Sequence, residues 1–379
     1  MGRDALTVLQ LVPALNAGGA ERSTLEIGAA LTAAGHRSIV VSAGGRLVPE
    51  LEAQGSRHVT LDLGRKSLRT VARIPKLRRI LREFAPDVVH ARSRLPAWCA
   101  YLAMTGPGAP RAHFVTTVHG LNTPGRYSAV LLRGERIVCV SATVRDYVLA
   151  NYPKVDPRRI VVIPRGVDPG VFPFGYRAGA DFRAALEREF PELAGRTLLT
   201  LPARGTRLKG HHDAIELVAR LRHAFDAGLL LLGVVEPGRE RYLEELRALA
   251  RRLGVGDRVA FSAPRSAVRD FYASSALVLQ LSRQAESFGR TVVEALSLGV
   301  PVLGYARGGV GELLRELFPA GLVPADDLDA LAHSASAVLR EPPAMQPVAG
   351  YRLADMQAAT LGLYRDVVDA GAPARTARA

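Results

Sequence analysis

The chain has 379 residues, 48% of them hydrophobic, which is enough to bury the cores of two domains. Its formal net charge of +14 is uneven, because residues 1–175 carry 24 Lys and Arg against 12 Asp and Glu (+12), whereas residues 176–379 carry 26 against 24 (+2). No apolar run reaches transmembrane length, no zinc-ligand pattern occurs, and no interleaved aromatic and basic tract indicates a nucleic acid partner.

The chain begins with a predicted strand, a glycine turn and a helix. Residues 6–12 are apolar, the turn contains Gly18 and Gly19, and the helix is expected to run to about Ala34. The glycine spacing is not Gly-x-Gly-x-x-Gly, and no acidic residue ends the next strand at 38–42, so a dinucleotide site is disfavoured. Paired glycines are typical of a tight turn and equally of a backbone that approaches a ligand, and both interpretations stay open.

Residues 66–84 predict a basic amphipathic helix in which Pro75 would introduce a kink. Its polar positions are cationic: Lys66, Arg69, Arg73, Lys76, Arg78, Arg79 and Arg82. Such a helix can pack on a core and solvate its cationic face, or it can dock on an anionic membrane surface. Since the sequence shows no signal peptide, we expect a cytoplasmic protein that associates peripherally with the inner membrane through this helix.

Polar side chains follow two later strands of the first half. Arg92 and Arg94 follow a predicted strand at 86–90, and His119 follows another at 113–118, with Arg126 further along. The carboxyl ends of parallel strands are where open α/β sheets bind ligands. His119 is therefore a candidate ligand contact, and the three arginines are either solvated or bind an anionic acceptor. Strands at 136–141 and 160–164 complete a first domain that is expected to end at residue 169.

The second half repeats the alternation of strands and helices, which predicts a second doubly wound domain over 170–348. Arg204 and Lys209 lie in a glycine-containing loop after a strand at 197–202, where they would clamp a diphosphate or remain exposed. A helix at 349–371 is expected to pack back on the first domain, and residues 372–379 are expected to be disordered.

A second loop of this domain runs from a strand at 276–281 into a helix. Ser287 is predicted to cap that helix, and Gly289 lacks a Cβ, so backbone N–H groups and the helix dipole favour an anion there. Glu286 and Glu294 flank the predicted anion site, and their carboxylates are strong acceptors for sugar hydroxyls.

These motifs together resemble glycosyltransferase family 4, whose members are retaining enzymes of the α/β GT-B fold, with two Rossmann-like doubly wound domains facing each other across a central cleft. The resemblance spans the chain and rests on Gly18-Gly19-Ala20-Glu21-Arg22, His119-Gly120, Gly166-Val167-Asp168, Arg204 with Lys209-Gly210, Glu286 with Glu294, and Gly308-Gly309 with Glu312. Two positions depart from the family pattern: Ala203 stands where glycine is usual, and Arg165 where asparagine is common. The segments at 90–93 and 286–291 are most similar to members that build bacterial lipopolysaccharide.

The resemblance implies a role for each motif residue. Gly18 and Gly19 would approach the donor diphosphate, and His119 would contact the transferred sugar. Arg204 and Lys209 would neutralise the leaving diphosphate. Glu286 and the backbone of Ser287, Phe288 and Gly289 would hold the sugar, and Glu294 would hold the ribose.

The implied enzyme is a metal-independent, retaining hexosyltransferase that needs no cofactor. Its donor would be a UDP- or GDP-sugar, with UDP favoured, and its acceptor an anionic glycolipid or oligosaccharide such as a lipopolysaccharide core or another cell-surface glycan. A sugar-nucleotide epimerase of the same fold and a non-catalytic sugar-nucleotide-binding subunit are the alternatives. The sequence leaves open the base, the sugar, the acceptor and the linkage.

Overall fold

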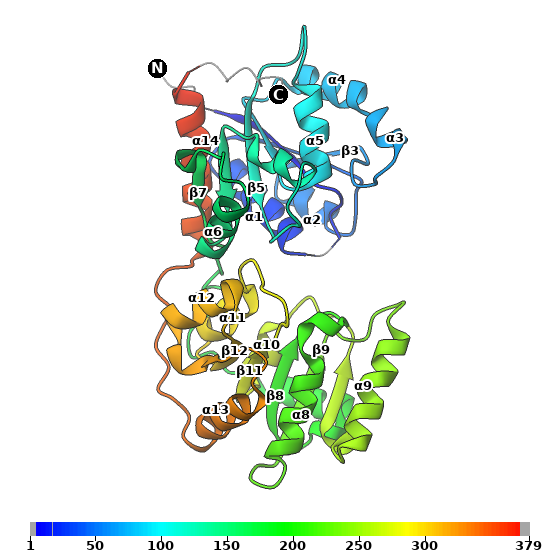
Figure 1. Cartoon of the computed structure of the whole chain (residues 1–379), viewed down its shortest axis with the longest axis vertical. Helices are drawn as coiled ribbons and strands as arrows, with labels where there is room; N and C mark the ends of the chain where they lie inside the picture. The colour runs from blue at the N-terminus through cyan, green and yellow to red at the C-terminus, as the bar shows by residue number, and fades with distance from the viewer. Residues whose placement is uncertain (1–4, 17, 372–379) are drawn as a thin grey trace. The chain divides into compact units, whose positions relative to one another are not determined.

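The computed structural model of the chain describes residues 5–16 and 18–371. The chain forms two compact units, coloured along the sequence in Figure 1: Met1–Arg165 with Leu353–Ala379, and Gly166–Arg352. The expected boundaries at 169 and 348 each lie four residues from the observed ones. The predicted disordered tail at 372–379 falls outside the described residues.

The first unit is built on a parallel sheet with the strand order β3-β2-β1-β4-β5-β6-β7. This is the Rossmann order extended by one strand, and the order reverses between β1 and β4, where open sheets bind ligands. The strands are β1 Thr7–Leu11, β2 Arg37–Ser42, β3 Arg57–Thr60, β4 Val88–Ala91, β5 His113–Val118, β6 Arg136–Cys139 and β7 Ile160–Val162. The helices are α1 Gly19–Ala33, α2 Val48–Ala53, α3 Leu68–Val71, α4 Ile74–Phe84, α5 Arg94–Ala103, α6 Ala142–Asn151 and α14 Leu353–Asp369.

The second unit has a parallel sheet with the equivalent order β10-β9-β8-β11-β12-β13, so its order reverses between β8 and β11. The strands are β8 Thr197–Pro202, β9 Ala227–Leu232, β10 Val259–Ser262, β11 Leu277–Gln280, β12 Val302–Tyr305 and β13 Leu322–Val323. The helices are α7 Ala180–Glu189, α8 His211–Leu221, α9 Glu240–Arg252, α10 Arg269–Ala273, α11 Arg290–Ser297, α12 Gly308–Leu317 and α13 Leu328–Arg340. Two Rossmann-like parallel sheets are therefore confirmed.

The last helix, α14, belongs to the first unit although the whole second unit separates it from that sheet in sequence. Apolar residues of β1, β4, β5 and β6 cluster with Ile27 and Leu31 of α1 and with Met356 and Tyr364 of α14. The Tyr364 hydroxyl also lies 2.6 Å from Nδ1 of His90 in β4. Helices α1 and α14 thus cover the same face of the sheet, next to the strands that end at the ligand-binding edge.

The predicted helix at 66–84 is wrong as a single element. The structure contains a short helix, α3, and a separate helix, α4, with Pro75 in the first turn of α4. Proline fits there because the first N–H groups of a helix have no intrahelical partner. Pro75 therefore begins a helix instead of kinking one.

Side chains cap two helix N-termini, but the predicted cap of α11 by Ser287 is wrong. Ser141 accepts a hydrogen bond from Val144 N (3.1 Å) at the start of α6, and Asp327 accepts one from Ala330 N (2.9 Å) at the start of α13. Helix α11 instead has Gly289 as its N-cap, with φ of 109° and no side-chain capping bond. Ser287 lies too early in the loop to cap it.

No helix in the described part of the chain combines the length and apolarity needed to cross a bilayer.

Candidate functional site

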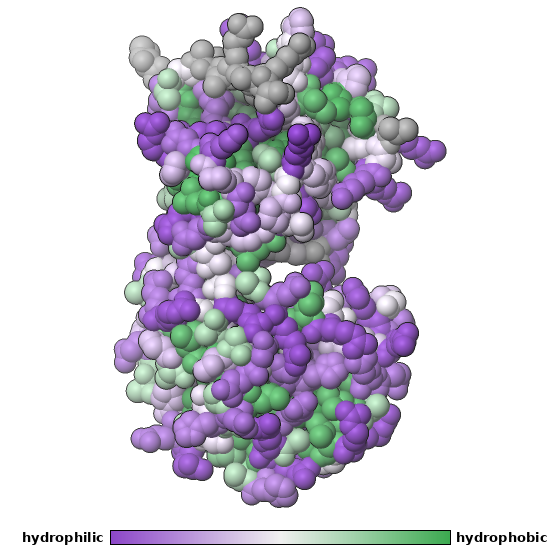
Figure 2. All heavy atoms as spheres, in the orientation of Figure 1, coloured by the Kyte–Doolittle hydropathy of each residue, from purple (hydrophilic) through white to green (hydrophobic). Residues whose placement is uncertain are grey.

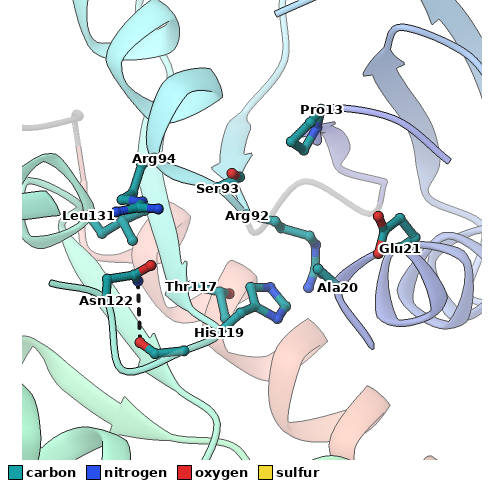
Figure 3. A pocket seen from close by; sticks show the side chains of 11 residues that line it. Pro13, Ala20, Glu21, Arg92, Ser93, Arg94, Thr117, His119, Asn122 and Leu131 are labelled. Atoms are coloured by element: carbon teal, nitrogen blue, oxygen red, sulfur yellow. Dashed lines mark hydrogen bonds between the residues drawn. The ribbon is translucent and has the colours of Figure 1, made fainter. Parts of the chain in front are cut away.

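The first unit has a pocket of about 300 Å³ at the carboxyl ends of its central strands (Figure 3). His119 after β5 and Arg92 after β4 line it, together with Arg94 at the start of α5. Ala20 and Glu21 from the first turn of α1 form another wall. The structure thus brings His119, Arg92 and Arg94 together beside the glycine turn, because β1, β4 and β5 are neighbours in the sheet.

Of the two alternatives left open for Arg92, solvation at the surface is wrong, because only 3% of the residue is exposed. Its Nε donates to Gln10 Oε1 of β1 at 2.8 Å, and Gln10 Nε2 in turn donates to Thr24 O of α1 at 3.1 Å. Nη2 of Arg92 has no hydrogen-bond partner in the structure although it is buried. A buried, unsatisfied guanidinium N–H is costly in the free protein, so it favours an anionic or hydroxyl-bearing ligand in this pocket.

His119 contacts Arg165, one of the two residues that depart from the family pattern. Nη2 of the buried Arg165 lies 2.7 Å from Nδ1 of His119. Burial lowers the pKa of His119 well below its usual value, and the charges of Arg165 and Arg92 lower it further. The imidazole is therefore neutral at physiological pH.

A fully buried histidine, His90, lies behind the pocket. His90 makes hydrogen bonds through Nδ1 with Tyr364 and through Nε2 with the hydroxyl of Thr117, at 2.6 and 2.7 Å. Burial and the nearby arginines lower its pKa well below the usual value. Since Thr117 lines the pocket, this network links the pocket wall to α14.

The other two predicted acceptor arginines differ in position. Arg94 lines the pocket and lies over the ring of Tyr127, with its guanidinium carbon 5.2 Å from the ring centroid. Arg126 is exposed and is not one of the residues that line the pocket. The pocket therefore contains Arg92 and Arg94 but not Arg126.

The glycine turn has a structural requirement of its own. Gly18 is the N-cap of α1 with φ of 152°, and a Cβ there would lie 2.4 Å from Oε2 of Glu21. Gly18 therefore leaves room for the Glu21 carboxylate at the helix N-terminus, where a negative charge is favourable. A Cβ on Gly19 would meet no atom within 4 Å, so the backbone at Gly19 is open to a ligand.

In the second unit, Lys209 and Glu286 meet although 77 positions separate them. Lys209 Nζ lies 2.6 Å from Glu286 Oε1, and both side chains are about one quarter exposed. Glu286 also accepts a hydrogen bond from Ser282 Oγ. The two residues come from the loops after β8 and β11, which are the strands on either side of the switch in strand order.

Glycines set the positions of both loops. Gly210 has φ of 74°, and a Cβ there would lie 2.1 Å from Leu281 O, so the Lys209 loop packs directly on the end of β11. Gly309 N donates to Glu286 O at 2.7 Å, and a Cβ on Gly309 would lie 2.4 Å from Phe288 O. The paired glycines that begin α12 thus support the backbone that carries Glu286.

The remaining predicted residues surround these loops. Phe288 is buried and packs near the ring of Tyr351, whereas Arg204 is exposed. Glu294 is partly buried in the second turn of α11, with Oε2 3.5 Å from the Tyr272 hydroxyl. No cluster of three or more His, Cys, Asp or Glu side chains that could hold a metal ion occurs in the parts of the chain that the structure describes.

Comparisons with known proteins identify the family. Residues 17–171 match the family model described as Glycosyltransferase Family 4, and residues 184–351 match the one described as Glycosyl transferases group 1. The chain is a family 4 glycosyltransferase.

Relatives of this glycosyltransferase agree with the assignment. It is 29% identical over 314 residues to D-inositol 3-phosphate glycosyltransferase 1 of Catenulispora acidiphila. The aligned region covers 75% of this chain and 73% of that protein. A glycosyltransferase from Rickettsia africae has a crystal structure that is 27% identical, with a TM-score of 0.86 over 97% of this chain and 100% of that chain. HepE from Anabaena, solved with UDP and glucose, is 20% identical with a TM-score of 0.75 over 96% and 97% of the two chains. The predicted GT-B fold is confirmed.

Sequence reasoning did not single out several residues of the glycosyltransferase that hold its site. Gln10 orients Arg92, Ser282 orients Glu286, and Tyr272 lies against Glu294. A polar residue inside the apolar strand β1 was a usable signal for Gln10, because buried polar groups need partners. Ser282 and Tyr272 had no comparable signal in the sequence.

Proposed function

We propose that this glycosyltransferase transfers a hexose from a UDP-sugar to a hydroxyl group of an anionic acceptor, with retention of the anomeric configuration and without a metal ion. The observation that carries the proposal is the Lys209–Glu286 pair at the switch point of the second sheet. A cation for the diphosphate next to a carboxylate for the sugar hydroxyls suits a nucleotide-sugar. The UDP and glucose bound by HepE support the same donor class.

The chemistry follows from charge development on the leaving group. As the bond from sugar to diphosphate breaks, Lys209, Arg204 and the N-terminus of α11 would stabilise the negative charge. Glu286 would hold the sugar hydroxyls, Glu294 the ribose, and the backbone at Gly18 and Gly19 the diphosphate. His119, being neutral, would donate a hydrogen bond to the transferred sugar. The acceptor hydroxyl would attack the same face of the sugar and pass its proton to the departing diphosphate oxygen.

A donor screen tests this proposal. UDP-sugars should raise the melting temperature of the purified protein more than GDP- or ADP-sugars, and transfer should continue in excess chelator. NMR of the product should show retention at the anomeric carbon. Activity that is lost on chelation and restored by manganese would contradict the metal-free mechanism. Conversion of the donor sugar to its epimer without any acceptor would indicate the epimerase alternative, and binding without turnover the non-catalytic one.

The acceptor is proposed to carry a phosphate or carboxylate that binds near Arg92 and Arg94. The unsatisfied Nη2 of Arg92 and the cationic pocket wall support an anion there. The name of the Catenulispora relative includes inositol 3-phosphate, a phosphorylated compound, which supports the same acceptor class. A phosphorylated lipopolysaccharide core or other cell-surface glycan has this chemistry and remains our proposal for the acceptor class.

Arg94→Ala should raise the acceptor KM about tenfold and leave donor hydrolysis unchanged, because a charge-assisted hydrogen bond to an anion contributes about 1.5–3 kcal/mol. Initial rates across a panel of phosphorylated and unphosphorylated acceptors measure the effect. Arg111→Ala, an exposed site outside the pocket, is the matched control. An Arg94 variant that impairs donor binding alone would refute the assignment.

We also propose that the first unit docks on an anionic membrane, with a smaller set of cations than the sequence suggested. Arg73 pairs with Asp62 at 3.2 Å, and Arg78 and Arg82 donate to backbone carbonyls of the same unit. The exposed cations Arg69, Lys76 and Arg79 support docking. Because the proposed contacts are cations, we propose electrostatic attachment. The face of the molecule shown in Figure 2 is mostly hydrophilic, with separate apolar areas.

Charge reversal at Arg69, Lys76 and Arg79 should weaken binding to anionic vesicles by more than about a hundredfold, since each cation near an anionic leaflet contributes about 1 kcal/mol and reversal also adds repulsion. Sedimentation with anionic and neutral vesicles measures this, and raised salt should release the wild-type protein. Reversal of the exposed Arg241, Arg251 and Arg252 in the second unit is the control. Equal binding to neutral and anionic vesicles would reject the proposal.

A further inference from the structure

Arg165 occupies a position at which the family pattern commonly has asparagine, and here it is a buried cation. It follows β7, the last strand of the first sheet, and only 7% of it is exposed. Nη2 lies 2.7 Å from His119 Nδ1 and 3.4 Å from His119 Nε2, and Nη1 lies 3.9 Å from Met356 Sδ of α14. The guanidinium thus lies between the last helix and the pocket histidine.

The chemistry of the two groups fixes the direction of this hydrogen bond. A guanidinium has only donors, so His119 accepts in this contact, and Nδ1 is the nearer of its two nitrogens, at 2.7 Å against 3.4 Å for Nε2. A neutral imidazole that accepts at Nδ1 carries its proton on Nε2. Protonation of His119 would place an N–H on Nδ1, directed at the Arg165 cation, and this is unfavourable at a partly buried position.

The charges around His119 act in the same direction. Arg165 after β7, Arg92 after β4 and His90 within β4 all face the ring and disfavour its cationic form, after burial itself. Glu21 of α1 is the acidic residue that lines the same pocket. The charges of the buried Arg92 and Arg165 thus act together against a cationic His119.

We propose that Arg165 is a positioning residue that fixes His119 as a neutral imidazole with its N–H at Nε2, available to the transferred sugar. This role rests on the proposed function of His119. A neutral donor suits the reaction because the sugar becomes positively charged in an oxocarbenium-like transition state, which an imidazolium would destabilise. An asparagine side chain would supply a donor without the charge, so the arginine adds protection against protonation.

The test is NMR of the ring nitrogens in protein labelled with 15N-histidine, with His119→Gln to assign the resonance. In the wild type, His119 should show an acceptor-type Nδ1 and a protonated Nε2 throughout the range from about pH 5 to 8. Arg165→Met keeps an apolar contact with Met356 but removes the charge and the donor. In this variant the pKa of His119 should rise, because the charge of Arg165 is removed, and the two neutral tautomers should mix. Arg165→Lys should keep the pKa low, because it retains the charge.

Kinetics provide a second readout that separates this proposal from the proposed function. In Arg165→Met, kcat should fall about tenfold as pH drops through the new pKa of His119, with little change in donor KM; the wild type and Arg165→Lys should lack this limb. Arg159→Met is the structural control, because Arg159 donates to Leu132 O at 2.7 Å and does not contact His119. A wild-type His119 that titrates near 6.5, or an unchanged His119 spectrum in Arg165→Met, would overturn the proposal even if sugar transfer is demonstrated. If no transfer is found, the NMR result still decides the role of Arg165.

Discussion

Glu286→Gln should reduce sugar transfer about a hundredfold or more and leave binding of the nucleoside diphosphate nearly intact. A charge-assisted hydrogen bond contributes about 1.5–3 kcal/mol, and a carboxylate can accept from two sugar hydroxyls. Glutamine keeps one acceptor oxygen for Lys209 Nζ, now 2.6 Å from Glu286 Oε1, so the cation should stay in place. Transfer rates and calorimetric binding of UDP would separate the two effects.

The observed ion pair changes what is expected from its other member. Lys209→Ala should weaken binding of the nucleoside diphosphate about tenfold or more, because it removes a charge from the diphosphate site. Lys209 and Ser282 both donate to Glu286, and this variant removes the donor at Lys209. Sugar transfer should therefore fall as well. The double variant Glu286→Gln/Lys209→Ala should therefore lose less transition-state stabilisation than the two single variants lose in sum.

Arg207→Ala is the matched control, because Arg207 lies in the same loop but pairs with Glu245 on the surface. It should change neither donor binding nor transfer substantially, since exposed ion pairs contribute little. Unchanged turnover in Glu286→Gln would remove Glu286 from the sugar site.

Gly309→Ala should disable the enzyme from a position that no substrate needs to touch. The new Cβ would lie 2.4 Å from Phe288 O and 2.5 Å from Phe288 Cα, and both are backbone atoms that cannot rotate away. The loop that carries Glu286 must then shift, and the hydrogen bond from Gly309 N to Glu286 O would be strained. Overpacking of this kind costs about 1–3 kcal/mol in stability, and a shift of about 1 Å at a reacting group can cost a hundredfold in rate.

Thermal denaturation and transfer rates of the Gly309 variant measure both effects. Gly362→Ala is the control, because a Cβ on Gly362 in α14 would meet no atom within 4 Å and alanine favours a helix. That variant should be as stable as the wild type or more so, with unchanged activity. A Gly309→Ala protein with wild-type transfer would show that the loop tolerates displacement or that Glu286 does not need its observed position.

The sequence by itself determined the two α/β domains and the loops that carry the candidate site. Alternating apolar strands and helices are local patterns, and in parallel sheets the carboxyl ends of strands share one edge. His119, Lys209, Glu286 and Glu294 could therefore be assigned to ligand-binding edges before any contact was known. The same local reasoning failed at the edge strands β3 and β13, because β3 is only partly buried and β13 has only two residues, so neither gives a clear apolar pattern.

Only the tertiary structure decided which side chains meet and which are buried. Arg92 and Arg165 followed strands as exposed arginines would, yet they are buried against Gln10 and His119, which lie 82 and 46 positions away. Lys209 finds Glu286 across 77 positions because the strands that carry their loops, β8 and β11, are neighbours in the sheet. The physical reason is that a long side chain takes its partner from whatever the folded sheet places beside it, and local spacing carries no information about that neighbour.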